Sequence, residues 1–371
     1  MNAFRPTSKD IELVSPPPDS ISKIAFSPVQ DILAVASWDN NVRLYNVNAQ
    51  GQSEPKSMYA HEGPVLDLSW SKSGQQLFSS GCDNAARMHD LTTGQTTQVA
   101  AHDAPIKCVE YVDMPNGSGG TGILATAGWD KKLKYWDLRA QAPVITVDLT
   151  DRAYAMDVAG NTLVSYDLVL ATADRQIHIW NLTNPTQKFR SLESPLKWQT
   201  RDIQCFPTAE AYAVGSVEGR IAIQYVDPAE EKKNYSFKCH RIDIPNGSML
   251  NTPATTGSQN VFAVNTISFH KVQGTFCTGG GDGSLSFWDG YARTKLKSFP
   301  AKEINNGDPE ARPPVWGTPI VSTSFSHNHD ILAYALSYDW SKGHSGVPTN
   351  PVTKVMLHPV KPDEVTKKVK K

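Results

Sequence analysis

Short runs of alternating apolar and polar residues recur along the chain, and each run follows an acidic residue. The clearest example is the stretch 127–139, which reads AGWDKKLKYWDLR. After Asp130, Leu133 and Tyr135 fall on one face of an extended chain and Lys134 falls on the other, because successive side chains of a strand point to opposite faces. The pattern predicts a turn at the acidic residue and a β-strand directly after it.

Six copies of this pattern are present, and the positions three and five residues after the acid are apolar in every copy. Successive copies lie about 44 to 47 residues apart, except for a last interval of about 64. This repetition indicates strands with one face in a common core. The turn acids are Asp39, Asp83, Asp130, Asp174, Glu218 and Asp282, and the residues six positions later are Tyr45, His89, Trp136, Trp180, Gln224 and Trp288.

An interval near 40 to 45 residues with a Trp-Asp ending is typical of WD40 propeller blades. Further apolar strands precede the turn acid, as at 106–111 and 123–127. Each repeat is then a small antiparallel sheet that cannot bury both faces alone and has to stack on its neighbours around a closed ring. We therefore predict an all-β fold, a seven-bladed WD40 β-propeller.

The seventh blade is expected to be irregular. Strands are predicted at 321–325, 331–336 and 355–357, and the segment SYDWSKGH at 337–344 interrupts them. The short strand 11–14 has no partner of its own. We expect it to complete the last blade and close the ring, which removes exposed sheet edges.

The other segments are more polar. We expect residues 1–10 to be a flexible N-terminus, 11–360 to form the propeller, and 361–371, which ends in KKVKK, to be a basic C-terminal tail. The long interval before blade six contains 227–260, which is rich in polar residues, Gly, Pro and Asn and is predicted to be an insertion. Insertions in repeat folds often carry function.

Composition argues against several classes of protein. With 371 residues and a formal net charge of −1, the chain has no overall field that would attract nucleic acid or a membrane. The first residues lack the apolar stretch of a signal peptide, and no run reaches the ~18 apolar residues of a membrane span, so we expect no membrane insertion. Five scattered cysteines without a Cys-x-x-Cys pair favour reduced thiols in a cytosolic or nuclear protein.

The chain lacks the common catalytic and cofactor motifs. It has no phosphate loop followed by Lys-Ser/Thr, no zinc-type Cys/His spacing and no Gly-x-Ser-x-Gly, so we predict no enzyme, cofactor or metal. His61 and His102 open blades two and three and are expected to hydrogen-bond Asp83 and Asp130. Catalytic pairs or metal ligands are the alternative, but repetition in several blades favours a structural role. The structural blade residues are then His61, His102, Asp39, Asp83, Asp130, Asp174 and Asp282.

Two features suggest a binding surface. Trp38 and Trp129 precede turn acids, where exposed aromatic side chains serve as interaction anchors, although each could instead pack on a neighbouring blade. Two arginines around one glutamate would form a clamp, because each guanidinium can bind a carboxylate through two hydrogen bonds. Scattered solvated charges are the alternative. The basic residues gathered in blades five and six are Lys197, Arg201, Arg220, Lys238, His240, Arg241, Arg293, Lys295 and Lys297.

The segments HDAPIKCVEY, SPLKWQTR, VEGRIAI, SFKCHR, FWDGYARTKLK and SYDWSKGH together resemble the poly(A) RNA export family of nuclear-pore WD40 proteins. The resemblance covers about 11–344. A sister family, the mitotic-checkpoint propellers, shares the HDAPI, VEGR and FKCHR stretches. The SYDWSKGH and ARTKLK segments resemble the export family and not its sister, so the chain is placed with the exporters.

This resemblance implies a non-enzymatic scaffold in the nucleus, at the nuclear pore and envelope, that shuttles to the cytoplasm. It implies binding of a GLEBS-type peptide from an FG-repeat nucleoporin, which docks mRNA-protein complexes at the pore. By matching motif, Arg201 and Arg220 are the expected carboxylate clamp and Trp38 an apolar contact. Gly290 departs from the family, which often has lysine there. The matching rim residues, where relatives also meet acidic partners, are Phe237, Lys238, His240, Trp288, Arg293 and Lys295.

Three alternatives remain open at the level of sequence. The first is a mitotic-checkpoint or spindle adaptor that uses the same face for other peptides. The second is a substrate receptor of a cullin-RING ubiquitin ligase, because 136–139 fits the Trp-Asp-x-Arg box of such receptors. The third is direct RNA binding, for which the near-neutral charge predicts only weak intrinsic affinity.

Overall fold

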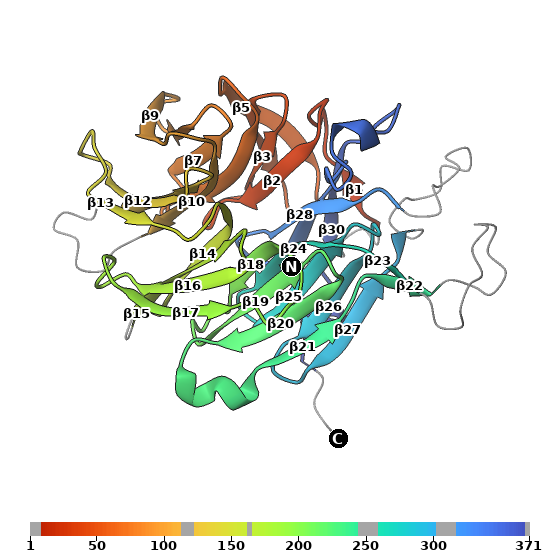
Figure 1. Ribbon diagram of the computed structural model, residues 1–371. Coiled ribbons are helices and arrows are strands. Elements are labelled where there is room, and N and C mark those ends of the chain that lie inside the picture. The colour runs from red at the N-terminus through yellow and green to blue at the C-terminus, as the bar shows by residue number, and fades with distance from the viewer. Residues whose placement is uncertain (1–8, 113–121, 162–164, 244–258, 302–316, 368–371) are drawn as a thin grey trace, which may run out of the picture.

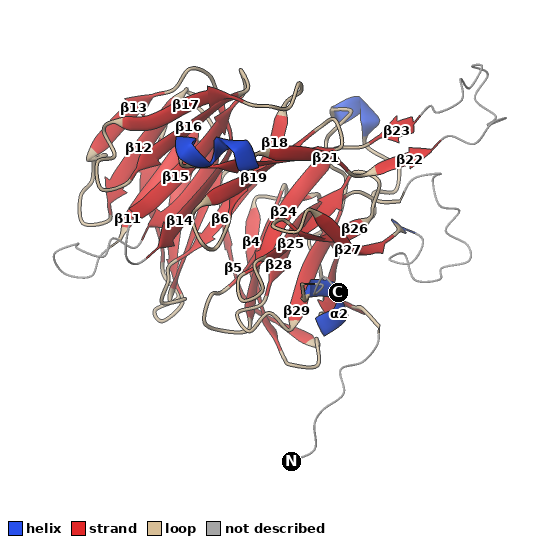
Figure 2. Ribbon diagram, turned by 90° about the horizontal axis from the view of Figure 1, so that it is seen from below, coloured by secondary structure: helices blue, strands red, loops and turns tan. Residues whose placement is uncertain are grey.

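Seven four-stranded antiparallel sheets are arranged as the blades of a ring, which confirms the predicted all-β, seven-bladed propeller (Figure 1). The computed structural model describes residues 9–112, 122–161, 165–243, 259–301 and 317–367. Strands make up nearly all of the regular structure in these ranges, and the few helices are short (Figure 2).

Blades one to six each use four strands in chain order. Blades one to three consist of β2 (Ile21–Phe26), β3 (Ile32–Ser37), β4 (Asn41–Val47) and β5 (Ser53–Ala60); β6 (Val65–Trp70), β7 (Gln76–Gly81), β8 (Ala85–Asp90) and β9 (Thr96–Ala101); and β10 (Ile106–Val112), β11 (Ile123–Gly128), β12 (Lys132–Asp137) and β13 (Ile145–Asp148). Blades four to six consist of β14 (Ala153–Asn161), β15 (Ser165–Thr172), β16 (Gln176–Asn181) and β17 (Lys188–Glu193); β18 (Thr200–Cys205), β19 (Ala211–Ser216), β20 (Arg220–Tyr225) and β21 (Tyr235–Lys238); and β24 (Val264–His270), β25 (Thr275–Gly280), β26 (Leu285–Asp289) and β27 (Thr294–Phe299).

Blade seven joins the two ends of the chain. Its strands are β28 (Ile320–Phe325), β29 (Ile331–Leu336), β30 (Lys354–Pro359) and the N-terminal β1 (Ile11–Glu12), in the spatial order β1-β30-β29-β28. The main-chain N–H of Leu13 continues the pairing by donating to the carbonyl of Val355 at 2.8 Å. The predicted closure of the ring by an N-terminal strand is therefore confirmed.

The stretch 227–260, expected as an insertion, is partly built into blade five. The 3-10 helix η1 (Pro228–Lys233) leads into β21, which is the outer strand of that blade. Tyr235 and Phe237 hold β21 in place by packing against the apolar cluster between blades five and six. Two further strands of this stretch, β22 (Arg241–Asp243) and β23 (Gln259–Val261), belong to no blade and pair with each other in a separate two-stranded sheet. Residues 244–258 lie outside the described part of the chain.

Residues that follow the expected propeller at its C-terminal end also take part in the fold. The helix α2 (Pro362–Val365) lies within the segment expected as a basic tail. Val365 is buried in the cluster between blades six and seven, and its carbonyl accepts a hydrogen bond from Thr275 Oγ1 at 2.9 Å. A second 3-10 helix, η2 (His344–Gly346), follows the SYDWSKGH segment.

Both faces of the central strands are buried, because each blade packs between two others. The apolar positions identified in sequence, such as Leu133 and Ile177, are fully buried. The intervening positions in blades four to six, His178, Ala222 and Ser286, are buried as well, since they face the blade on the other side. The equivalent residues in blades one to three, Arg43, Arg87 and Lys134, are half-buried. The alternation of apolar residues thus predicted one buried face of each strand. It did not predict burial of the other face, because polar residues such as His178 lie there.

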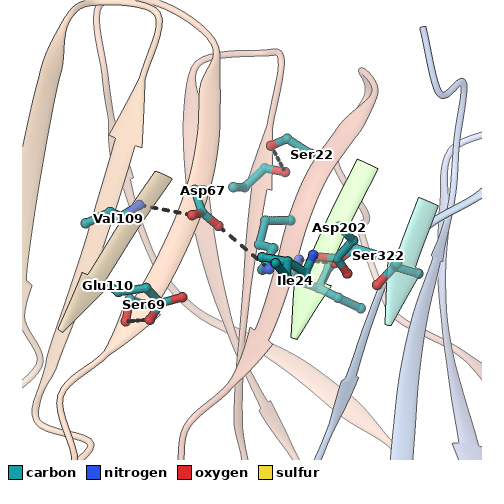
Figure 3. Close-up of polar contacts among 12 residues, drawn as sticks. Ser22, Ile24, Asp67, Ser69, Val109, Glu110, Asp202 and Ser322 are labelled. Carbon is teal, nitrogen blue, oxygen red and sulfur yellow. Dashed lines mark hydrogen bonds and ion pairs between the residues drawn. The ribbon is translucent and has the colours of Figure 1, made fainter. Parts of the chain in front are cut away.

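Adjacent blades are also joined by polar contacts around the axis, where a side chain of one innermost strand accepts a hydrogen bond from a main-chain N–H of the next (Figure 3). Asp67 Oδ2 accepts from Val109 N at 3.0 Å, and Ser322 Oγ accepts from Ile24 N at 3.1 Å. Asp202 Oδ2 accepts from the N–H of the adjacent strand β24 at 2.6 Å. These bonds satisfy main-chain groups on strands whose inner edge has no strand partner.

The innermost strands of all seven blades surround an axial cavity of about 730 Å³. Lys23 lies among carboxylates there, with its Nζ 3.8 Å from Asp67 Oδ1. Burial alone would lower the pKa of Lys23, but the nearby carboxylates of Asp67 and Asp202 outweigh it and hold that pKa above its ordinary value. Burial and the neighbouring acids raise the pKa of Glu110, and burial raises that of Asp157 to about 6.

Candidate functional site

A hydrogen-bonded brace ties the turn of blade three to its strands. His102 Nδ1 lies 2.9 Å from Asp130 Oδ2, and its Nε2 lies 2.8 Å from Thr126 Oγ1. The indole N–H of Trp136 donates to the same hydroxyl at 2.8 Å. Because histidine, threonine and tryptophan come from different strands or loops, the network fixes the turn relative to the sheet. Burial lowers the pKa of His102 more than the Asp130 carboxylate raises it.

Blade six contains the same brace. His240 Nδ1 lies 2.9 Å from Asp282 Oδ1, and Thr278 Oγ1 lies 2.9 Å from His240 Nε2 and 3.0 Å from Trp288 Nε1. His240 is only 6% exposed, so its ring nitrogens are directed inward. The structure thus assigns a packing role to His240 and Trp288; their expected contacts with an acidic partner remain a prediction.

The other blades use related polar contacts. In blade two, His61 lies 3.0 Å from Asp83 Oδ2 and 2.8 Å from Ser79 Oγ. In blade one, Arg43 pairs with Asp39 at 2.6 Å. Blade four lacks an opening histidine, and Thr172 Oγ1 donates instead to Asp174 Oδ1 at 2.5 Å. The turn acids are therefore anchored locally in every one of these blades.

These turns define one face of the ring. We call the face that carries the turn acids, between the second and third strands of each blade, the turn-acid face. Antiparallel pairing places the turn between β26 and β27 at the other end of blade six, on what we call the opposite face. The turn-acid face carries Trp38, which lies in the turn between β3 and β4, and also Arg201, Arg220 and Lys238, which lie at the strand ends next to such turns. Arg293 lies on the opposite face.

Aromatic side chains line the turn-acid face. Trp38 stacks on Trp340, with ring centroids 4.2 Å apart and 20° between the planes. Trp38 thus packs on a neighbouring blade, which was one of the two roles considered for it from the sequence, and both rings lie at the rim. Trp129 is 37% exposed and Trp198 is 59% exposed. Sequence reasoning did not identify Trp198 as a surface group, although its position between two basic residues in LKWQTR was a usable signal.

Arg201 is held in place by two other blades. Its Nη2 donates to Asn265 Oδ1 of blade six and to the carbonyl of Asp339 in blade seven, both at 3.1 Å. These bonds occupy one terminal nitrogen of a guanidinium that has five N–H donors in total. Arg201 is therefore positioned by its neighbours and retains donors for a ligand.

Arg220 lies in different surroundings, a pocket of about 420 Å³ between the end of blade four and blade five. Its Nε is 3.9 Å from Glu218 Oε2. Arg241 is oriented by the same turn, because its guanidinium donates to the carbonyls of Glu218 and Gly219. We call this site the blade-five basic pocket; its lining residues are Pro195, Leu196, Lys197, Glu218, Arg220, Ser236, Lys238 and Arg241.

The pocket has a strong positive bias, since four cationic side chains face one carboxylate. Arg201 does not belong to its lining, so the structure separates the two arginines that sequence grouped as one clamp. An arrangement of this kind suits an extended acidic ligand that meets Arg201 and Arg220 through different groups.

A second cluster of basic and aromatic residues lies toward the opposite face. The Arg293 guanidinium stacks over the Tyr235 ring at 4.4 Å, and Lys295 Nζ lies 6.0 Å from the Trp288 ring centroid. Phe237 packs on Trp288 with ring centroids 4.6 Å apart. The residues expected from the resemblance to form one rim therefore divide between two ends of the blades.

The described ranges contain no group of three or more His, Cys, Asp or Glu side chains arranged to hold a metal ion. All five cysteines are present as free thiols. Among the helices of the described residues, none has the length and apolar character needed to cross a bilayer.

Family models match parts of the chain. The WD domain, G-beta repeat model matches residues 94–137 and 251–289, and the anaphase-promoting complex subunit 4 WD40 domain model matches 24–114.

Several whole proteins are similar over nearly the entire chain. "mRNA export factor GLE2" of Chaetomium thermophilum is 46% identical over 96% of this chain and 91% of its own length. "Poly(A)+ RNA export protein" of Schizosaccharomyces pombe is 45% identical over 100% of this chain and 96% of its own length. "Protein Rae1" of Drosophila melanogaster is 42% identical over 90% of this chain and 89% of its own length. The chain belongs to the Rae1/Gle2 family of WD40 mRNA export factors, whose members are non-enzymatic.

Proposed function

We propose that this protein is a nuclear-pore adaptor that binds an acidic GLEBS-type peptide of an FG-repeat nucleoporin on its turn-acid face and thereby docks mRNA-protein complexes at the pore. The observation that carries the proposal is the blade-five basic pocket, which lies on the face that also exposes tryptophans. Membership of a family of mRNA export factors supports the same cellular role and a location in the nucleus.

The charges of the pocket favour a carboxylate ligand. In the described part of the chain, Lys197 and Lys238 have no carboxylate within ion-pair distance. The Glu218 carboxylate lies near Arg220 and accepts the main-chain N–H of Lys197, whereas Arg241 donates to main-chain carbonyls. An acidic peptide would neutralise these cations, and each bidentate arginine contact would add directional specificity. Nearby indole rings such as Trp198 supply apolar area that holds the peptide main chain.

Arg201 and Arg220 are expected to contribute differently. Arg201 is fixed before binding by Asn265 and Asp339, so little side-chain entropy is lost when it engages a glutamate. Arg220 is about one-third exposed, so its contact is screened by water until a peptide covers it. We therefore expect the larger loss from Arg201→Ala.

Titration calorimetry with a synthetic GLEBS-type peptide tests the proposal. Arg201→Ala is expected to weaken binding by about 2 to 5 kcal/mol, because the partner glutamate is left buried and unpaired. Arg220→Ala is expected to cost about 1 to 2 kcal/mol, between the exposed and desolvated limits. Arg139→Ala is the matched control, since Arg139 is an exposed arginine whose carboxylate partner is Asp137 on the opposite face. Wild-type affinity in the Arg201/Arg220 double variant would overturn the proposal.

The cluster on the opposite face is the proposed contact with acidic or RNA-containing cargo. Arg293 and Lys295 each lie over an aromatic ring, an arrangement that suits both carboxylates and stacked bases. If RNA is the ligand, affinity for single-stranded RNA falls steeply with salt, and Lys295→Ala reduces the slope of that dependence. Salt-independent RNA binding, or none, would leave an acidic protein segment as the cargo contact.

A further inference from the structure

Ser236 is the one hydroxyl-bearing residue in the lining of the blade-five basic pocket. It pairs with Ala222 across the sheet, and Lys238 follows two residues later on the same side of β21. Arg220 is directly opposite Lys238 in the register. The strand geometry therefore places the Ser236 hydroxyl beside two cationic side chains, and the pocket adds Lys197 and Arg241.

The same serine is accessible to an enzyme. Ser236 is exposed, and β21 is the outermost strand of blade five, so one of its edges is unpaired. The strand is extended, and Lys232 and Lys233 precede the serine, which gives a basic approach on its N-terminal side. An exposed, extended segment with a free edge can be gripped by an enzyme through main-chain hydrogen bonds.

We propose that Ser236 is a phosphorylation site, and that its phosphate occupies the blade-five basic pocket and excludes an acidic peptide from it. A protein kinase would transfer the γ-phosphoryl group of a nucleoside triphosphate. The Ser236 Oγ–P bond forms, the bond to the bridging β,γ-oxygen breaks, the nucleoside diphosphate leaves, and the hydroxyl proton passes to the kinase's catalytic carboxylate.

The physical basis is competition for the same cations. A phosphoserine carries about −1.5 to −2 charges and three acceptor oxygens, so it satisfies the arginine and lysine donors that would otherwise bind glutamates. Because the phosphate is covalently attached, its effective concentration at the pocket exceeds that of any free peptide. Binding elsewhere on the turn-acid face, including at Arg201, would persist with reduced affinity.

This inference rests on the proposed function, so the test separates the two. Full-length protein with phosphoserine installed at 236 is compared with unmodified protein in calorimetry with the GLEBS-type peptide. We expect a loss of about tenfold or more in affinity. Phosphoserine at Ser57, an exposed residue in the outer strand of blade one, is the matched control and should leave the affinity unchanged.

Phosphorus NMR gives a second measurement that needs no partner. The second phosphate pKa, ordinarily about 6, should be lower at position 236 than at position 57, because the pocket cations favour the dianion. Equal phosphate pKa values at the two positions would overturn the inference. So would equal peptide affinities for the unmodified and the 236-phosphorylated protein. If the unmodified protein binds no peptide while the 236 phosphate pKa is lowered, the proposed function fails and the internal phosphate contact is supported.

Discussion

The contact that fastens the two ends of the chain should make unfolding depend on pH. His358 of β30 lies between two carboxylates, with Nδ1 2.7 Å from Asp10 Oδ1 and Nε2 3.0 Å from Glu364 Oε2. Tyr334 also donates to Asp10, at 2.6 Å. A single imidazolium thus links the N-terminal segment, the last strand and α2.

The magnitude follows from the histidine pKa. Burial alone would lower the pKa of His358, but hydrogen bonds and charge from Asp10 and Glu364 outweigh it and raise the pKa from its ordinary 6.5 to about 9. Because one pKa unit corresponds to about 1.4 kcal/mol, the protonated contact contributes about 3 kcal/mol to the free energy of unfolding. A raised folded-state pKa means that this contribution is fully present below pH 6.5 and is lost as the pH rises through 9.

Urea unfolding of the wild type and His358→Gln at pH 5.5 and 9.5 tests this reasoning. The difference in unfolding free energy between the two proteins should shrink by about 3 kcal/mol at the higher pH. His344→Gln is the control, because His344 is exposed and should show no such change. The same difference at both pH values would mean that His358 is not charged in the folded protein, and the argument would fail.

Three other substitutions probe separate parts of the fold. Thr126→Val leaves the ring nitrogens of His102 and Trp136 without their shared hydroxyl, so we expect a loss of about 2 to 4 kcal/mol in urea unfolding, and a loss below 1 would contradict the brace. Lys23→Met leaves the axial carboxylates without their cation, and we expect the free energy of unfolding to fall by about 1 to 3 kcal/mol in the same assay. The loss is moderate because solvent partly screens these charges. Trp38→Ala should lower GLEBS-type peptide affinity about tenfold, and loss of the stacking on Trp340 should lower the free energy of unfolding by about 1 kcal/mol; unchanged affinity would exclude this ring from the site.

The blade architecture could be predicted because it depends on local periodicity. Alternation after Asp130 determines which side chains of β12 face the core, and its recurrence identifies six of the seven blades. The seventh was predicted from the less regular strands 321–325, 331–336 and 355–357. The closing strand β1 was predictable for a topological reason, since a ring made from one chain has to join its ends. The axial carboxylates escaped detection because a polar residue in a strand is normally solvent-exposed, whereas here it bonds the next blade.

The brace in blade six shows why the site was harder to predict than the fold. In blades two and three the histidine precedes its acid by 22 and 28 residues, but His240 precedes Asp282 by 42. The hairpin β22-β23 lies between them, so the spacing that identified the first two pairs did not apply. His240 consequently looked like a free basic residue next to Lys238 in the sequence.

Arg201 and Arg220 illustrate the remaining limit. Arg201 is oriented by residues 64 and 138 positions away, contacts that no local pattern encodes. Arg220 takes its surroundings from its own turn and from the neighbouring strand β21, which is why VEGR and SFKCHR could be read together as a basic site. One arginine is therefore fixed by the closed ring, and the other lies in a pocket between the end of blade four and blade five. A change that disrupts ring closure should therefore displace Arg201, because Arg201 is bonded to Asp339 of blade seven. A modification at the outer edge of blade five should affect Arg220 and leave Arg201 in place.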